Sequence, residues 1–147
     1  NIGDNMKIWI FIVFAFLSSI ANSDTLSDKD GAKNLAKSVM KKVEAGKSSE
    51  ALDLLKPYLI IPVAEFDVMK NQLAMQAPMI EQRFGKTISV ELADVEEVGE
   101  SLMLVMYIQK FEKHMMRWKF YFYKPKDGWV LNTFNTDDKI QLMFNNI

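Results

Sequence analysis

The sequence predicts an α+β domain in which N-terminal helices, one of them long and kinked, pack on a four-stranded antiparallel sheet that is followed by a short C-terminal helix. Residues 28–84 place apolar side chains at helical spacing, and from Lys86 onward apolar and polar side chains alternate with the period of a β-strand. Residues 102–134 are also rich in aromatic side chains, which favour strands. Because the helices precede a run of strands, they are expected to cover one face of the sheet.

The composition limits the chemistry that the chain can perform. Of its 147 residues, 49% are apolar and 25% charged, and the net charge is −1, so no bulk positive charge would attract nucleic acid. Because the chain has no cysteine, disulfides, thiol catalysis and thiolate metal sites are excluded. The single histidine, His114, is too few for a histidine-rich metal site. The sequence therefore predicts neither a metal nor a cofactor.

Residues 1–23 are expected to contain a secretory signal peptide and the residues upstream of it. A lysine follows Met6, an unbroken apolar run covers residues 8–17, and small residues that suit cleavage after Ala21 or Ser23 come next. A positive charge, an apolar stretch and small residues in this order are typical of such a leader.

A single domain is predicted over residues 24–147, and we expect the protein to be exported, either periplasmic or secreted. An anchor that is not cleaved is the alternative, although the apolar run is shorter than the ~20 residues that span a bilayer. The absence of cysteine favours a bacterial envelope over a disulfide-rich secretion route.

The first two helices are predicted from apolar periodicity and stop signals. A helix over residues 28–45 has Ser27 and Asp30 as an imitation of a capping box, and Gly46 ends it. A short second helix begins at Ser48 or Ser49 and ends before Pro57.

The third helix is predicted to run from Pro62 to Phe84. Pro78 lies inside it, and a proline removes one backbone hydrogen bond and kinks a helix. The helix should therefore be bent near Ala74 or split in two, and Gly85 should end it.

Alternation predicts the first strand and its end. Ile88, Val90 and Leu92 share one face, and Val95 breaks this parity, which predicts a β-bulge near Ala93. Gly99 and the glutamate after it are expected to form the turn to the second strand.

The second strand, residues 102–112, is apolar on both faces, so both faces should be covered. The helices can cover one, which leaves the other for the C-terminal segment or for a second subunit. We expect a homodimer through the sheet, with Met103, Val105 and Tyr107 as candidate interface residues.

The third strand should direct Met116, Trp118, Phe120 and Phe122 inward, with polar residues outward. Residues 125–128 form a tight turn. The fourth strand covers residues 129–135, and Asp137 is expected to cap a last helical segment that contains Ile140, Met143, Phe144 and Ile147.

The run RWKFYFYKPKDGWVLNTFNTDD, residues 117–138, resembles the closing hairpin of the nuclear transport factor 2-like superfamily, which has the cystatin-like α+β fold. In that superfamily a Gly-Trp pair opens the last strand, as Gly128 and Trp129 would here. The resemblance implies a curved sheet around a long helix, a cone-shaped pocket and, frequently, a dimer. Its members include ketosteroid isomerase-like and dehydratase-like enzymes, transport factors and small exported domains.

The leading hypothesis is a non-catalytic exported domain that binds a small apolar ligand or an envelope protein. Candidate pocket residues are Tyr107, Trp118, Tyr121 and Trp129. The alternative is an isomerase or lyase that pairs one of Tyr107, Tyr121 and Tyr123 with a carboxylate in the same pocket. The candidate carboxylates are Asp67, Glu81, Asp94 and Glu112. The basic residues that alternate with tyrosines after Arg117 are interpreted as a solvated strand face, so no nucleic acid is expected.

Overall fold

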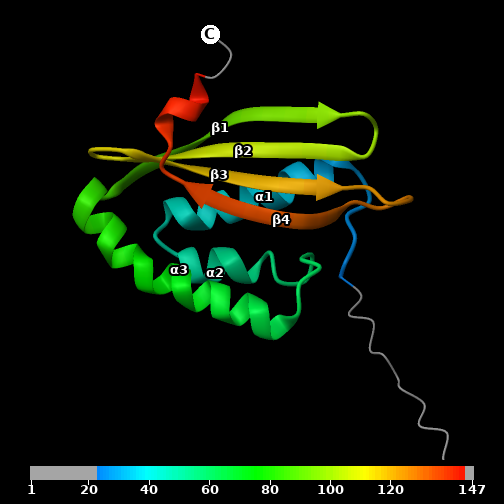
Figure 1. The fold of residues 1–147 in the computed structure, drawn as a ribbon, viewed down its shortest axis with the longest axis horizontal. Helices are drawn as coiled ribbons and strands as arrows, with labels where there is room; N and C mark the ends of the chain where they lie inside the picture. Colours follow the sequence, from blue (N-terminus) through cyan, green and yellow to red (C-terminus); the bar gives the residue numbers. More distant parts are fainter. Residues whose placement is uncertain (1–22, 145–147) are drawn as a thin grey trace, which may run out of the picture.

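The computed structural model describes residues 23–144, which fold as an α+β domain (Figure 1). The elements are α1 (Lys29–Glu44), α2 (Ser48–Asp53), α3 (Val63–Phe84), β1 (Thr87–Val98), β2 (Leu102–Phe111), β3 (Met115–Tyr123), β4 (Val130–Asp137) and the 3₁₀ helix η1 (Ile140–Met143). The predicted fold class is confirmed. The predicted signal peptide, up to residue 22, lies outside the described residues. Within residues 23–144, no helix has the length and apolarity needed to cross a bilayer.

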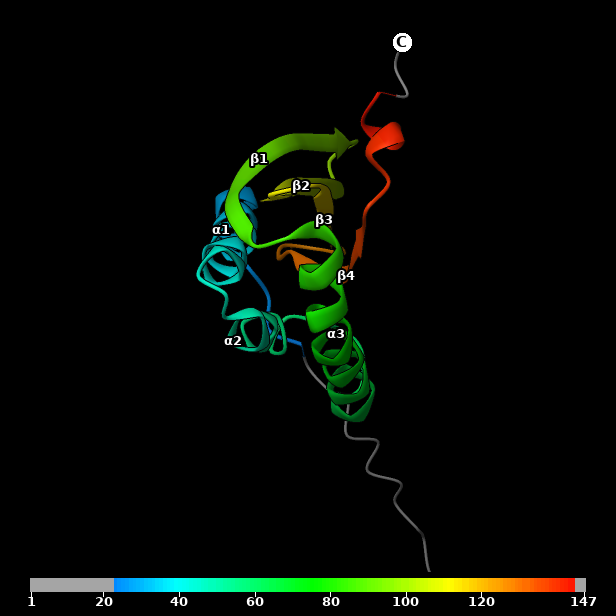
Figure 2. The ribbon, with the colours of Figure 1, turned by 90° about the vertical axis from the view of Figure 1, so that its left-hand side faces the viewer.

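The four strands form one antiparallel meander in the order β1-β2-β3-β4. Helix α1 lies on one side of the sheet and η1 on the other (Figure 2). The register of β1 against β2 shifts between Leu92 and Asp94, so the bulge predicted near Ala93 is confirmed. Gly99, with φ of 59°, makes the turn between the same two strands.

Helix α1 is the main support of the sheet. Its N-cap is Asp28 and not Ser27, because the Asp28 carboxylate accepts a hydrogen bond of 2.7 Å from the Gly31 backbone N–H. Its inward side contains two alanines, which let the helix axis approach the strands closely. The buried residues of α1 are Ala32, Ala36, Val39, Met40 and Val43.

The core lies between α1 and the inner face of β2 and β3. Cross-strand pairs join Tyr107 to Trp118, Val105 to Phe120 and Met103 to Phe122 on this face. Phe120 is 0% exposed and Phe122 is 1% exposed. Burial of each large apolar side chain stabilises the fold by about 1.5–3 kcal/mol.

This arrangement corrects the predicted dimer interface. Met103, Val105 and Tyr107 are buried under the helices, so a second subunit cannot contact them. The prediction was wrong because both parities of β2 are apolar, so alternation alone cannot tell which one faces inward. The residues that β2 turns outward are Leu104, Met106 and Ile108.

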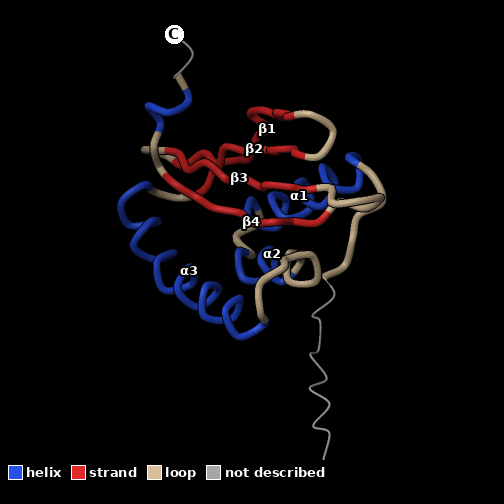
Figure 3. The backbone as a smooth tube through the Cα atoms, turned by 45° about the vertical axis from the view of Figure 1, so that its right-hand side comes forward, coloured by secondary structure: helices blue, strands red, loops and turns tan. Residues whose placement is uncertain are grey.

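Helix α3 has its fully buried side chains near its two ends, and Met69 and Leu73 pack partly buried against the core between them. It is continuous through Pro78, so it is not split in two, and the bend near Ala74 stays a prediction, as does the curvature of the sheet. Only Phe66 and Phe84 are buried in this helix. Figure 3 shows α3 meeting the strands at its C-terminal end and lying beside α2 nearer its N-terminal end.

The predicted C-terminal helix is a single 3₁₀ turn, Asp137 belongs to β4, and Ile147 lies outside the described residues. The Asp137 carboxylate accepts hydrogen bonds from Arg117 Nε (2.7 Å), Arg117 Nη2 (2.8 Å), Lys119 Nζ (2.7 Å) and the Lys139 backbone N–H (3.0 Å). Arg117 is only 5% exposed, so the predicted solvated face of β3 is wrong at this position. This one carboxylate therefore joins β3, β4 and the segment that precedes η1.

The junction of α3 and β1 depends on a glycine. Gly85 has φ of 85°, and a Cβ there would lie 2.8 Å from Glu112 Cβ. We expect Gly85→Ala to lower the free energy of unfolding by about 3 kcal/mol, from backbone strain plus overlap. Gly46 has φ of 74° with nothing within 4 Å, so Gly46→Ala is the matched control, at about 1 kcal/mol. Urea denaturation measures both free energies of unfolding. If Gly85→Ala and Gly46→Ala lowered them equally, the contact with Glu112 would not be the reason for the glycine.

Candidate functional site: a cavity between α3 and the sheet

A cavity of about 450 Å³ lies between α3, the end of α1, α2 and the inner face of the sheet. Most of its wall is apolar. Helix α3 contributes Leu73, Ala77 and Ile80, and the opposite wall contains Leu52, Phe111 and Trp118. The volume lies within the roughly 300–1,000 Å³ that is usual for small-molecule sites.

The cavity exists because α3 is held at a distance from the sheet over its middle part. Phe66 fixes one end in the core, with Lys56 Nζ 5.5 Å from its ring centre, and Phe84 fixes the other end. Between them, α3 turns the small side chains of Ala74 and Ala77 toward the cavity. Side chains of this size leave the space open.

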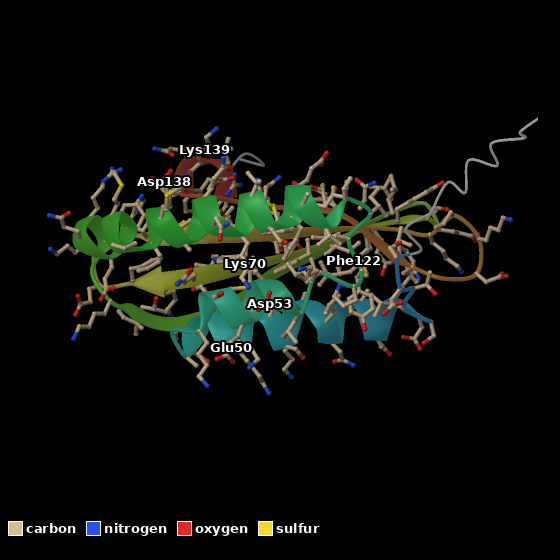
Figure 4. The ribbon with its side chains drawn as sticks, turned by 90° about the horizontal axis from the view of Figure 1, so that it is seen from below. Glu50, Asp53, Lys70, Phe122, Asp138 and Lys139 are labelled. Atoms are coloured by element: carbon tan, nitrogen blue, oxygen red, sulfur yellow. The ribbon has the colours of Figure 1, made fainter. Side chains whose placement is uncertain are left out.

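The cavity rim on the side of α2 carries an ion pair. Lys70 Nζ on α3 lies 2.5 Å from Asp53 Oδ1 on α2, and Figure 4 shows the two side chains meeting between these helices. The lysine side chain is 23% exposed. Such a pair contributes about 0–1 kcal/mol, so it orients α3 more than it stabilises it.

A chain of hydrogen bonds crosses the sheet wall of the cavity. Trp118 Nε1 donates to Gln109 Oε1 at 2.9 Å, and Gln109 Nε2 donates to Thr87 Oγ1 at 2.8 Å. Gln109 is 7% exposed, and all three residues line the cavity. Gln109 and Thr87 were missed in the sequence. The available signal was that Gln109 is the one polar side chain among the inward-facing positions of β2.

The four predicted pocket residues do not form one site. Trp118 lines the cavity, whereas Tyr107 is buried in the core, where burial raises the pKa of its hydroxyl. Tyr121 lies on the opposite face of the sheet, in a groove of about 500 Å³. Trp129 is buried at the far end of the domain, where its backbone pairs with Leu26.

The tyrosine–carboxylate pair of the isomerase hypothesis is not brought together in the described residues. None of Tyr107, Tyr121 and Tyr123 lines the cavity, although Glu81 does. Among the other carboxylates, Asp67 pairs with Lys56, and Glu112 accepts a hydrogen bond from the Lys86 backbone.

His114 also lies apart from the cavity wall, whereas one further carboxylate, Glu44, lines it. The His114 ring packs edge-on against Phe84, with ring centres 4.6 Å apart. Between residues 23 and 144, no three acidic or histidine side chains are placed to hold a metal ion together.

The outer face of the sheet carries a second apolar surface. Leu104, Met106 and Ile108 form a half-buried stripe along β2. On one side of it β1 presents exposed acidic residues, and on the other side β3 presents Arg117 and Lys119. The acidic residues that share this face are Glu91, Asp94 and Glu96.

The Gly-Trp pair on which the family resemblance depends has a local structural reason. A Cβ at Gly128 would lie 2.9 Å from Thr25 Cβ, so glycine lets the N-terminal segment cross the β3–β4 turn. Leu26 and Trp129 then exchange two backbone hydrogen bonds of 2.8 Å. Comparison of the chain with protein-family models, curated proteins and solved structures found no match. Membership of the superfamily thus stays a prediction.

Proposed function

We propose that this chain is an exported, non-catalytic binding domain that holds a small apolar ligand in the cavity between α3 and the sheet. The observation that carries the proposal is the cavity of about 450 Å³, walled by Trp118 and by the inner face of α3. An apolar cavity with a few convergent polar groups is the usual form of a small-molecule site. The apolar run of residues 8–17 and the small residues after it support export.

Native mass spectrometry of the purified protein tests this function. We expect an added mass of a small organic molecule, lost when the collision energy is raised, because an apolar cavity retains an apolar guest. Ala77→Phe, which places a ring in the cavity, should lack the added mass. A chain that carries no guest, and takes up none when apolar compounds are added, would contradict the proposal.

We also propose that a second copy of the chain covers the outer face of the sheet. The stripe of Leu104, Met106 and Ile108 lies between an acidic row on β1 and the Arg117–Lys119–Asp137 cluster, which keeps one net positive charge, so the two sides of the stripe carry opposite charge. A two-fold axis parallel to the strands would stack β2 on β2 and place the acidic row of each copy over the net positive Arg117–Lys119–Asp137 cluster of the other. An axis perpendicular to the strands would instead oppose acidic rows, which is unfavourable.

A charge in the stripe should separate the two copies. We expect Leu104→Lys to shift the protein from dimer to monomer, because it would bury an ammonium group in the apolar centre of the interface. Met75, 69% exposed on α3, gives the control Met75→Lys, which should remain dimeric. Sedimentation velocity distinguishes them. An unmodified protein that is monomeric at every concentration would contradict the proposed dimer.

A further inference from the structure

The orientation of the Gln109 side chain is fixed by its neighbour. The indole N–H of Trp118 can only donate a hydrogen bond, so the atom 2.9 Å away must be the amide oxygen of Gln109. The amide nitrogen then points to Thr87 Oγ1, 2.8 Å away, and donates to it. The hydrogen bonds therefore run, from donor to acceptor, from Trp118 to Gln109 and from Gln109 to Thr87.

The series of hydrogen bonds from Trp118 to Thr87 ends in groups that can still donate a hydrogen bond. Among the residues that the structure describes, Thr87 Oγ1 takes part in this one side-chain hydrogen bond, as the acceptor. Its own hydroxyl hydrogen is therefore available to another group. The Gln109 amide also has a second N–H. Both residues line the cavity, and cooperative polarisation along the chain strengthens the terminal donor.

We propose that the ligand is an apolar molecule with a neutral carbonyl oxygen, which accepts hydrogen bonds from the Thr87 hydroxyl and the Gln109 amide. This inference rests on the proposed binding function and adds the chemical class of the ligand. An apolar guest without an acceptor would displace water and leave these donors unpaired, which is unfavourable. A charged group is disfavoured because Glu44 and Glu81 balance Lys70 and Lys86 in the cavity wall, and burial of an additional, unpaired charge beside the buried Gln109 is costly.

Two probes of similar size, each with two phenyl rings on one carbon, test the inference. Benzophenone carries a carbonyl oxygen where diphenylmethane carries two hydrogens. ¹H–¹⁵N NMR titration of the full chain measures both affinities and follows the Trp118 indole N–H, which lies at the start of the hydrogen-bond chain. We expect benzophenone to bind about tenfold more tightly, the ratio that one buried hydrogen bond gives.

Variants then reverse or remove the donors. Gln109→Glu puts an acceptor where the amide stood, so the Thr87 hydroxyl turns to the new carboxylate and the preference for benzophenone should disappear. Thr87→Val removes the hydroxyl alone and should reduce the ratio at least twofold without the risk of a buried charge. Thr87→Ser should retain the ratio. Thr136→Val is the matched control, because Thr136 lines the same cavity but takes no part in the hydrogen bonds between Trp118, Gln109 and Thr87.

The outcomes separate the inference from the function on which it rests. Failure of both probes to bind would overturn the proposed cavity function. Equal binding of both probes to the unmodified chain, or a ratio that Thr87→Val and Thr136→Val change equally, would overturn the carbonyl inference alone. A tenfold ratio that Thr87→Val reduces and Thr87→Ser keeps would support it.

Discussion

Phe66→Ala is expected to lower the free energy of unfolding by about 3–5 kcal/mol, the cost of truncating a buried phenylalanine. Phe66 is 1% exposed and is the buried anchor of the first half of α3. The loss of the Phe66 ring should also loosen α3, which forms one wall of the cavity, because the following turns of α3 contribute no fully buried side chain until Phe84. Urea denaturation measures the first effect, and hydrogen exchange of the α3 amides measures the second.

The control for this change lies on the same helix. Val68 is 57% exposed, so Val68→Ala should change the free energy of unfolding by no more than about 0.5 kcal/mol. If both substitutions cost the same, α3 would not be anchored through Phe66.

Asp137→Asn should be nearly as costly, at about 3 kcal/mol, because it leaves the buried guanidinium of Arg117 without its counter-charge. The side chain of Arg117 is 6% exposed and that of Asp137 is 20% exposed, so solvent compensates little. Asp127→Asn, in the exposed β3–β4 turn, is the control and should be neutral. Thermal and urea denaturation at pH 7 compare the three proteins.

The unmodified protein and Asp137→Asn should also differ in how their stability responds to acid. Burial opposes ionisation of Asp137, but hydrogen bonds from Arg117 and Lys119 outweigh it and hold the pKa of the carboxyl well below its usual range. Its stabilisation is therefore complete above the unfolded pKa of about 4 and is lost as the pH falls below that value. The stability difference between the unmodified protein and Asp137→Asn should shrink below about pH 4. A constant difference down to pH 2 would contradict this linkage.

Local patterns predicted most of the fold. The change of period at Lys86 separated helices from strands, and the broken parity at Val95 located the bulge of β1. These features depend on neighbours in the sequence, so one chain is enough to reveal them. The length of α3 through Pro78 could not be decided in the same way, because a kinked helix and two helices share one pattern.

The candidate site was predicted less well because it depends on pairs far apart in the sequence. Trp118 was identified as a pocket residue, but its partner Gln109 is defined by strand register and Thr87 by the neighbouring strand. Trp129 was grouped with it because both are aromatic, although Trp129 pairs with Leu26 at the other end of the domain. Register and helix placement, which single-sequence periodicity does not encode, decide these positions.

The most direct measurement of the central claim is a fluorescence titration with N-phenyl-1-naphthylamine, a neutral apolar probe that brightens when it leaves water. The unmodified chain should bind it saturably, with one probe per chain, in the cavity beneath α3. Ala77→Phe, on the cavity side of α3, should weaken binding at least tenfold, and Met75→Phe, on its exposed side, should leave it unchanged. Unaltered binding by Ala77→Phe, or an equal loss in Met75→Phe, would contradict a ligand site between α3 and the sheet.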